Sequence, residues 1–289
     1  MNTDPRRPLP VTLPALVSVL ILVGCGSRPA EAPRTGESTT DHPAAAATHE
    51  ESHWDYGPEA GPAAWGRLKP EFAACSEGRN QSPIDLKAGT PAVQPSKQIQ
   101  FRPAALHILH HEHTADVVNT GHSIQVDYPE ADTLTVGDET FALLQYHFHS
   151  PSEHTVDGKI FPMEMHLVHK SADGRLAVVG VFIEEGAPNA AFDPIWENLP
   201  GEKGAARHYE EVKVDVDQLL PADRATWRYD GSLTTPPCSE GVKWFVMKTP
   251  IQLSAGQIDK LRATLKGNNR PVQPLNDRTV VMDAMPEKL

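Results

Sequence analysis

Apolar and polar residues alternate through much of the stretch 143–169, near the middle of the chain. Successive side chains of a β-strand point to opposite faces, so every second residue shares a face. The polar face of the first strand would carry Gln145, His147 and His149, and that of the second Glu164, His166 and Val168. The SPSEHTVDGK segment between the strands is rich in turn-forming residues, so the pattern predicts an antiparallel pair in which three histidines converge.

Other segments predict further elements of a β-rich domain. The run 176–183 is apolar on both faces, as expected of a central strand that is covered on both sides. Valines at 212, 214 and 216 alternate with charged residues, which predicts an amphipathic strand. An Asp-Pro pair at 193–194 is expected to begin a short helix, and a capping box over 254–257 a second one. Taken alone, these spacings predict an α+β domain with a metal-binding hairpin.

Three imidazoles on a rigid sheet suit a borderline cation such as zinc. Three protein ligands leave a fourth tetrahedral position for water, which is the arrangement of catalytic rather than structural zinc sites. A ligating imidazole needs an acceptor for its other N–H, and Gln145 and Glu164 lie two residues from His147 and His166 on the same faces. The alternative is that the histidines of the first strand are polar residues on a solvated face.

The same stretch resembles the zinc-binding core of the alpha-class carbonic anhydrases. Its Q-x-H-F-H, S-E-H-T-V-D-G and E-x-H-L-V-H elements stand in the order of that family. A second block, GSLTTPPCSEGVKW over 231–244, resembles the family's active-site loop. The resemblance extends from about His53 to about Arg278. It implies Zn²⁺ as the cofactor, held by His147, His149 and His166.

From this resemblance we expect a single α+β, β-rich domain over 53–289, with a large, mostly antiparallel twisted central sheet and short peripheral helices. We expect zinc-dependent, reversible hydration of carbon dioxide to bicarbonate and a proton, by attack of zinc-bound hydroxide. In carbonic anhydrases, the reference case for this effect, zinc lowers the pKa of a bound water to about 7. Two other interpretations stay open: a noncatalytic relative that kept the fold as a binding module, and a surface zinc-binding protein.

The resemblance also implies catalytic roles for His122, Glu153 and Thr234. Thr234 would accept a hydrogen bond from the zinc hydroxide and donate its own to an ionised Glu153, which aims the hydroxide at the substrate. His122 would carry protons between the site and solvent, because the unperturbed pKa of imidazole, about 6.5, suits transfer near neutral pH. The alternative for His122 is an exposed turn histidine without a role.

Further residues would bind substrate or support the ligands. The implied substrate-binding residues are Thr235, Val168, Val178, Leu233, Val242 and Trp244. An apolar wall beside a polar metal suits an apolar linear substrate such as carbon dioxide. The residues implied to brace the metal ligands are Gln145, Glu164, His154 and Tyr229.

Residues 1–24 resemble a lipoprotein signal peptide. The apolar run after Arg6 and Arg7 is short and interrupted by proline, and it ends in Leu-Val-Gly before Cys25, as a bacterial lipobox does. We therefore expect Cys25 to be a lipid anchor and 25–52, rich in Ala, Pro, Thr, Ser and Glu, to be a flexible linker. The domain would be exported and lipid-anchored to the cell envelope, in the periplasm or outside the cytoplasmic membrane. The alternative for Cys25 is a buried core cysteine.

With Cys25 as the anchor, Cys75 and Cys238 remain. Bacterial members of the family commonly carry cysteines in these two contexts, so the resemblance implies a disulfide between them in an oxidising compartment. The alternative is two free thiols.

The formal net charge of −12 argues against nucleic-acid binding, which needs a basic face. The partners that we expect are carbon dioxide and bicarbonate, and a membrane reached through the lipidated cysteine, with a homodimer left open. The histidine-rich segment LHILHHEH at 106–113 is either a solvated strand or hairpin, or a secondary metal site.

Overall fold

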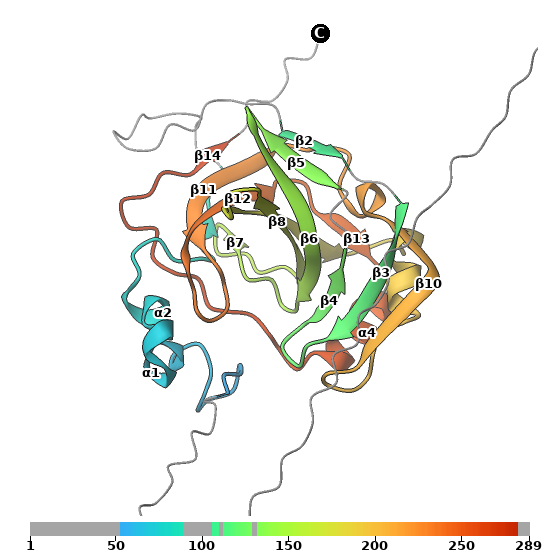
Figure 1. The fold of residues 1–289 in the computed structure, drawn as a ribbon, viewed down its shortest axis with the longest axis horizontal. Coiled ribbons are helices and arrows are strands. Elements are labelled where there is room, and N and C mark those ends of the chain that lie inside the picture. The colour runs from blue at the N-terminus through green and yellow to red at the C-terminus, as the bar shows by residue number, and fades with distance from the viewer. Residues whose placement is uncertain (1–52, 89–105, 110–111, 129–131, 283–289) are drawn as a thin grey trace, which may run out of the picture. The chain divides into compact units, whose positions relative to one another are not determined.

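The computed structural model describes residues 53–88, 106–109, 112–128 and 132–282 (Figure 1). All of them belong to one compact unit, residues 49–289. The predicted signal peptide, Cys25 and the predicted linker lie outside the described residues. Within the described ranges no helix has the length and apolar character needed to cross a membrane.

Strands dominate the fold. The strands are β1 (Asp85–Leu86), β2 (Leu106–Leu109), β3 (Glu112–Asn119), β4 (Ile124–Asp127), β5 (Thr133–Val136), β6 (Glu139–His149), β7 (Thr155–Val156), β8 (Met163–Ser171), β9 (Leu176–Glu185), β10 (Ala206–Asp215), β11 (Thr226–Ser232), β12 (Glu240–Met247), β13 (Ile251–Leu253) and β14 (Val281–Met282). The helices are α1 (Trp65–Leu68), α2 (Ala74–Glu77), α3 (Asp193–Trp196) and α4 (Ala255–Thr264), with 3-10 turns at Pro70–Phe72, Ala190–Phe192 and Val216–Leu219. The predicted β-rich α+β class with short helices is confirmed.

One large sheet organises the molecule. Its main path runs β10-β3-β4-β6-β8-β9-β12-β11-β14, and every pair along it is antiparallel except β9 with β12. Strand β13, which lies off this path, also pairs with β9 in parallel. The long strand β6 crosses the middle of this sheet (Figure 1). The mostly antiparallel sheet is therefore confirmed, with a parallel centre that makes it mixed.

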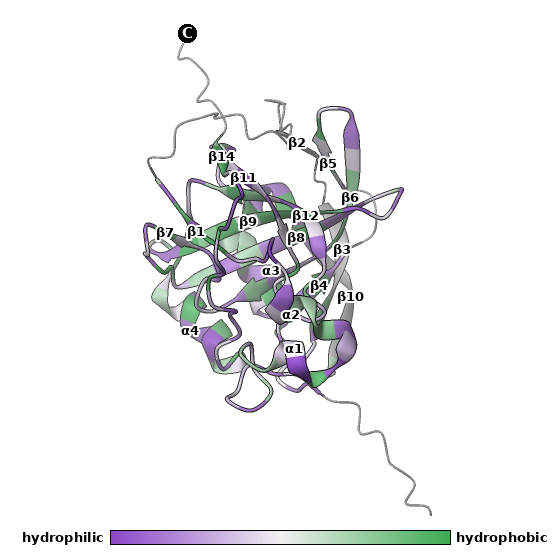
Figure 2. Ribbon diagram, turned by 90° about the vertical axis from the view of Figure 1, so that its left-hand side faces the viewer, coloured by the Kyte–Doolittle hydropathy of each residue, from purple (hydrophilic) through white to green (hydrophobic). Residues whose placement is uncertain are grey.

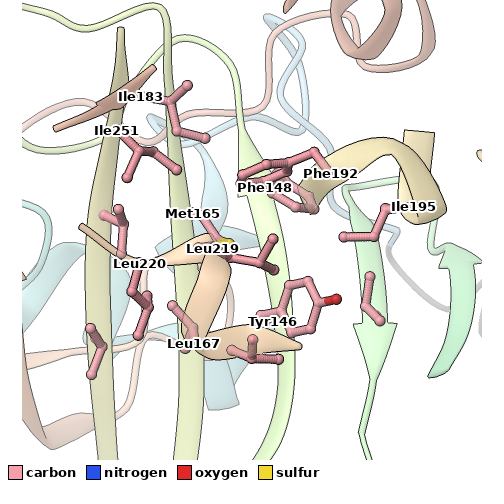
Figure 3. Close-up of a cluster of buried hydrophobic side chains, with 14 of the residues drawn as sticks. Tyr146, Phe148, Met165, Leu167, Ile183, Phe192, Ile195, Leu219, Leu220 and Ile251 are labelled. Carbon is pink, nitrogen blue, oxygen red and sulfur yellow. The ribbon is translucent and has the colours of Figure 1, made fainter. Parts of the chain in front are cut away.

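The predicted hairpin of histidine strands is the pair β6 and β8, and its register places His147 opposite His166. Alternate residues face the other side of the sheet, where Tyr146, Phe148, Met165 and Leu167 join the main hydrophobic core (Figure 3). The three histidines do not belong to that core. Along each strand of the hairpin, every second side chain thus enters the core and the others face the side of the histidines, as the alternation of the sequence predicts.

Strand β9 lies at the centre of the sheet and is buried on both faces, as its apolar run predicts. Val179, Val181 and Ile183 enter the main core, whereas Val178 and Phe182 enter a second cluster on the opposite face. Hydrophobic colouring follows β9 and β12, while α1 and α4 mix hydrophobic and hydrophilic residues (Figure 2). The sheet therefore separates two apolar layers, and the histidines lie on the side of the second one.

The helix predicted to begin at 193–194 is confirmed as α3, which starts at Asp193 with Pro194 in its first turn. A 3-10 turn precedes α3, and its cap is Asn189, whose side chain accepts a hydrogen bond from the Ala191 N–H at 3.1 Å. Asn189 supplies the acceptor that exposed N–H groups of a first turn require. The capping box of α4 is confirmed, since the Ser254 hydroxyl accepts from the Gln257 N–H at 3.3 Å and Gln257 Oε1 accepts from the Ser254 N–H at 3.1 Å.

Two other expectations about strands are met in part. Strand β10 contains Val214, which is buried, but it ends at Asp215, and the buried Val216 begins a 3-10 turn. The histidine-rich segment contributes β2 and the start of β3, which pair with different strands and so form no hairpin with each other. The side chains of this segment lie outside the described ones, so its predicted metal site stays a prediction.

Candidate metal centre

The register of β6 and β8 brings the three predicted histidines together. Ring centroids lie 5.0 Å apart for His147 and His149, 5.4 Å for His147 and His166, and 4.6 Å for His149 and His166. One ligand nitrogen from each ring falls within 4.8 Å of the other two. These distances suit a single cation held between the rings.

Each ring has one nitrogen next to a hydrogen-bond acceptor. His147 Nδ1 lies 2.8 Å from Gln145 Oε1, His149 Nδ1 lies 2.7 Å from the Asn268 carbonyl oxygen, and His166 Nε2 lies 2.9 Å from Glu164 Oε1. The buried Nε2 of His149 has no hydrogen-bond partner in the described part of the chain. A buried polar atom without a partner is costly, and a metal ion would satisfy it.

The protonation state of the rings also fits a metal. Burial lowers the pKa of all three histidines, that of His149 to about 4 and that of His147 well below its ordinary value. Neutral imidazole is the form that binds metal, so the rings are ready to coordinate at neutral pH without first losing a proton. The residues present therefore fit a zinc ion.

Glu164 is the main support of His166. Its carboxylate accepts from the backbone N–H groups of Glu153 at 2.9 Å and His154 at 2.8 Å, and it contacts His154 Nδ1 at 2.7 Å. Burial acts to raise the pKa of Glu164, but His154 and His166 outweigh it and hold that pKa well below its usual value. His154 in turn contacts the Tyr229 hydroxyl at 2.6 Å. The residues predicted to brace the ligands thus lie where such support is needed.

Glu153 lies next to the histidines, and the Thr234 hydroxyl acts on its carboxylate. Glu153 Oε1 is 3.5 Å from His149 Nδ1, and its Oε2 is 3.8 Å from His166 Nδ1. Burial raises the pKa of Glu153 to about 7, against the opposing effects of His166, the Arg270 N–H and the Thr234 hydroxyl. A bound cation would favour the ionised carboxylate.

The predicted substrate wall forms one cluster beside the centre. Val168, Val178, Val242 and Trp244 are buried together, and Leu233 packs against them half-buried. Trp244 also meets the His166 ring edge-on, with centroids 4.9 Å apart. Thr235 is half-buried two residues beyond Leu233, and its carbonyl accepts from the Cys238 N–H at 2.8 Å. The apolar wall and the polar threonines therefore belong to the same margin of the site.

His122 lies in the turn between β3 and β4, beside a cavity of about 430 Å³ that Tyr56 also lines. Its ring stacks on Trp54, with centroids 3.7 Å apart and planes 14° from parallel. The Thr120 hydroxyl accepts from the His122 and Ser123 N–H groups and so holds the turn. Burial first, then the charges of His53 and Lys203, lower the pKa of His122 to about 4. In this conformation the ring is neutral.

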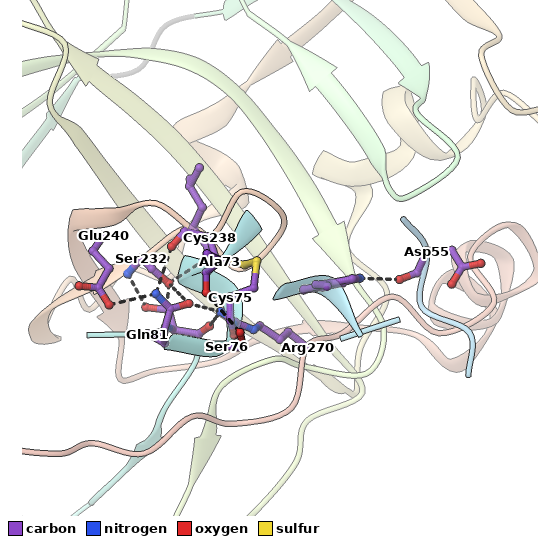
Figure 4. Close-up of a disulfide and its surroundings, with 12 residues drawn as sticks. Asp55, Ala73, Cys75, Ser76, Gln81, Ser232, Cys238, Glu240 and Arg270 are labelled. Carbon is purple, nitrogen blue, oxygen red and sulfur yellow. Dashed lines mark hydrogen bonds between the residues drawn. A yellow bond between two sulfur atoms is a disulfide. The ribbon is translucent and has the colours of Figure 1, made fainter. Parts of the chain in front are cut away.

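The predicted disulfide is confirmed. Cys75 of α2 and Cys238 are bonded, and both pack with Trp65 in a small cluster of their own (Figure 4). The bond ties the N-terminal helices to the loop that carries Thr234. Disulfides are typical of oxidising compartments, which favours an exported protein.

Two contacts of the site come from residues to which sequence reasoning gave no role. Asn268 accepts the hydrogen bond of His149 through its backbone oxygen, and the Arg270 N–H donates to Glu153 Oε1 at 2.8 Å. Both lie in the segment NNRPVQPL, residues 268–275. Backbone atoms carry both contacts, so residue type alone could not reveal them.

Comparisons with known proteins agree with this geometry. A family model described as eukaryotic-type carbonic anhydrase matches residues 60–284. The carbonic anhydrase of Nostoc sp. is 45% identical over 234 residues, which cover 79% of this chain and 85% of that protein. The carbonic anhydrase of Neisseria gonorrhoeae is 39% identical over 274 residues, 94% of this chain and 98% of that protein. A structure of the Thermovibrio ammonificans alpha-carbonic anhydrase with the inhibitor sulfanilamide has a TM-score of 0.72 at 43% identity, covering 79% of this chain and 98% of that one.

These matches place the chain among the metal-dependent lyases. The chain belongs to the eukaryotic-type, or alpha, carbonic anhydrase family, as the resemblance of its motifs indicates.

Proposed function

We propose that this protein catalyses the reversible hydration of carbon dioxide to bicarbonate and a proton, with zinc held by His147, His149 and His166. The observation that carries the proposal is the convergence of three neutral imidazoles within 4.8 Å, each braced at its other nitrogen. When bound, the ion makes water a nucleophile at neutral pH. An apolar cluster beside these rings offers carbon dioxide a dry surface.

Glu153 and Thr234 would orient the reacting oxygen. The Thr234 hydroxyl would donate its hydrogen bond to the Glu153 carboxylate. It could then only accept a hydrogen bond from the reacting oxygen, which fixes the orientation of that oxygen. The backbone N–H of Thr234 would face an oxygen of carbon dioxide, and Thr235 would contact bicarbonate. The wall of Val168, Val178, Leu233, Val242 and Trp244 would exclude water from the substrate.

His122 would move the proton to solvent. Its Nδ1 is buried without a hydrogen-bond partner among the described residues, so the ring gains a partner by turning out of its present position. A ring stacked on Trp54 with a pKa of about 4 accepts a proton poorly at neutral pH. Transfer would therefore require His122 to leave the stack and regain a pKa nearer 6.5.

Two variants test these roles. His166→Ala is expected to abolish tightly bound zinc and hydration, because two imidazoles remain where three converge. His122→Ala is expected to keep zinc and slow turnover, and imidazole buffer should restore the rate because it replaces the missing base. Metal analysis and stopped-flow hydration, with and without a chelator, measure both.

Active, zinc-free His166→Ala would refute the proposed dependence on zinc, and wild-type protein without hydration activity would refute the hydratase proposal. A lack of imidazole rescue would remove His122 as the shuttle. Inactive protein with one firmly held zinc would favour the noncatalytic binding module. Several exchangeable zinc ions per chain with little hydration would favour the surface zinc-binding protein. No observation on the described residues favours either alternative.

We also propose that Cys25 carries a lipid anchor and that the catalytic domain lies in the periplasm or elsewhere outside the cytoplasmic membrane. The Cys75–Cys238 disulfide supports export. Mass spectrometry of the mature N-terminal peptide tests the anchor, since an unmodified Cys25 would contradict it.

A further inference from the structure

Arg270 is a buried cation, with 1% of its surface exposed. One terminal nitrogen of its guanidinium donates to Gln81 Oε1 at 2.8 Å and to the Ser82 carbonyl at 2.7 Å. The other donates to the Cys75 carbonyl at 2.7 Å, and the group lies over the Trp65 ring, 5.8 Å from its centroid. Figure 4 shows the side chain reaching toward Cys75 and Gln81. Burial lowers the pKa of Arg270 to about 10, so the group stays charged at neutral pH.

A buried charge persists only where fixed dipoles satisfy it, and three oxygens converge on this one. The planar fork of a guanidinium matches several acceptors at once and loses little freedom in doing so. Because the guanidinium is fixed at its far end, the side chain of Arg270 also restrains its own backbone.

The backbone N–H of the same residue points into the site. It donates to Glu153 Oε1 at 2.8 Å, and Glu153 is itself 1% exposed. The position of this N–H fixes one oxygen of the carboxylate. The freedom of Glu153 therefore depends on how firmly residue 270 is held.

The anchor of the guanidinium also supports the loop that carries Thr234. Cys75 is bonded to Cys238, and the Gln81 side-chain amide donates to the Cys238 carbonyl at 3.1 Å. At the other end of the loop, the Ser82 N–H donates to the Ser232 hydroxyl at 2.9 Å. The same cluster of groups thus fixes residue 270 and both ends of the Thr234 loop.

We propose that Arg270 is a positioning residue for the reaction: its guanidinium, anchored on Cys75, Gln81 and Ser82, holds the peptide N–H that aligns Glu153 with Thr234. This inference rests on the orienting role proposed above for Glu153. It assigns the NNRPVQPL segment a part in the chemistry as well as in the fold.

Arg270→Lys tests the proposal, because lysine keeps the charge and loses the fork. We expect kcat/KM to fall about 10- to 100-fold, the range found when partners of metal-site groups are removed. Zinc content should stay near that of the wild type, because none of the three histidines is touched. Rates are expressed per zinc-loaded protein, so that a mere loss of folded protein does not lower them.

Arg278→Lys is the matched control. Arg278 is also buried, donates to the carbonyls of Leu275, Asp230 and Pro274, and lies over an aromatic ring, that of Tyr229. It contacts neither Glu153 nor a histidine of the centre among the contacts described. We expect a similar loss of thermal stability in both variants and a kcat/KM within about twofold of the wild type in the control, because Arg278 touches neither Glu153 nor a metal ligand directly.

A second measurement needs no activity. In zinc-free protein, hydrogen exchange at the amide of position 270 should be slow in the wild type and in Arg278→Lys, and faster in Arg270→Lys. In a Glu153→Ala background, Arg270→Lys should lower kcat/KM little further, since the two act as one unit.

Full protection of the 270 amide with unchanged kcat/KM in Arg270→Lys would overturn the proposal, as would losses that add to those of Glu153→Ala. If Glu153→Ala alone were fully active, the proposed role of Glu153 would fail, and the exchange data would still report on the anchor. Should Arg270→Lys not fold, Gln81→Met removes one of the three acceptors. Gln81→Met should then lower kcat/KM and speed the exchange of the 270 amide by smaller amounts. If it left both unchanged, the proposal would be overturned.

Discussion

At the scale of single residues, the surroundings of His122 change its acid–base chemistry. Isolated imidazole titrates near pH 6.5, but this ring is half-buried against Trp54 and faces His53 and Lys203. Only Asp55 acts to raise its pKa. In the stacked position the lowered pKa therefore keeps the imidazole unprotonated at neutral pH.

We expect NMR titration of His122 in the zinc-free protein to give a pKa well below 6.5, in the direction of about 4. Lys203→Met should raise this pKa, because it removes an ammonium group that disfavours a second positive charge on the nearby ring. Lys170→Met is the control, since the exposed Lys170 is not among the groups that act on His122. An unperturbed pKa near 6.5 in the wild type would mean that the stacked conformation is rare in solution.

The sign of the linked stability follows from the same pKa. Between about pH 6.5 and about pH 4 the unfolded chain binds a proton at this histidine and the folded chain does not. The part of the free energy of unfolding that is linked to neutral His122 is therefore complete above pH 6.5, and it is lost as the pH falls through that interval. His149, with its pKa also lowered to about 4 by burial, adds a loss in the same direction.

Residue types and parity were enough to predict part of the site. His147, His149 and His166 stand on predictable strand faces, and Gln145 and Glu164 lie within reach because residues i and i+2 share a face. The acceptor of His149 is 119 positions away in sequence, and it is a backbone oxygen. No local pattern encodes such a contact, because it depends on how the last loop crosses the sheet.

At the scale of elements, β9 determines how closely the site can be packed. Gly180 of β9 lies opposite His166 of β8, and a Cβ at this position would stand 3.1 Å from Glu164 Oε1. Real Cβ contacts are seldom this short, so a side chain there would displace the carboxylate that braces His166. A glycine in a central strand usually costs stability, and here it makes room for Glu164.

Gly180→Ala is expected to weaken zinc binding by about 10- to 100-fold, as other changes beside metal ligands do. Competition with a chelator measures the affinity, and circular dichroism checks that the sheet is retained. Gly256→Ala in α4 is the control, because nothing lies within 4 Å of its would-be Cβ. Equal zinc affinities in the two variants would show that Glu164 tolerates the crowding.

Element existence was more predictable than element arrangement. The alternation in β6 and β8 and the capping box of α4 follow from short-range patterns. The parallel pairing of β9 with β12 joins segments about 65 residues apart, as the register of Val178 with Trp244 requires. The start of α3 at Asp193 follows from the Asp-Pro pair, whereas the 3-10 turn before it is capped by Asn189, a contact that the Asp-Pro pair does not predict.

At the scale of the whole molecule, the disulfide closes a loop that contains most of the sheet. Cys75 and Cys238 are 163 positions apart, and between them lie β1 to β11. A cross-link restricts the unfolded chain more as its loop grows, which for this length amounts to roughly 5 kcal/mol in the chain-entropy model.

Reduction of the disulfide is expected to lower the free energy of unfolding by up to about 5 kcal/mol. Urea unfolding with and without a reductant measures the difference. A Cys75→Ser, Cys238→Ser double variant should unfold at the lower midpoint in both conditions. A midpoint that does not move on reduction of the native protein would show that the cross-link contributes nothing to stability.

The contact between His149 and the Asn268 carbonyl also constrains the order of events during biosynthesis. The ribosome adds His149 long before Asn268 and Arg270. A growing chain therefore contains the three histidines before it contains the Asn268 carbonyl that orients His149 and the Arg270 N–H that orients Glu153. The proposed zinc site would therefore be complete only after residues 268–270 have been made. For an exported chain, loading would take place after translocation, from the metal supply of the destination compartment.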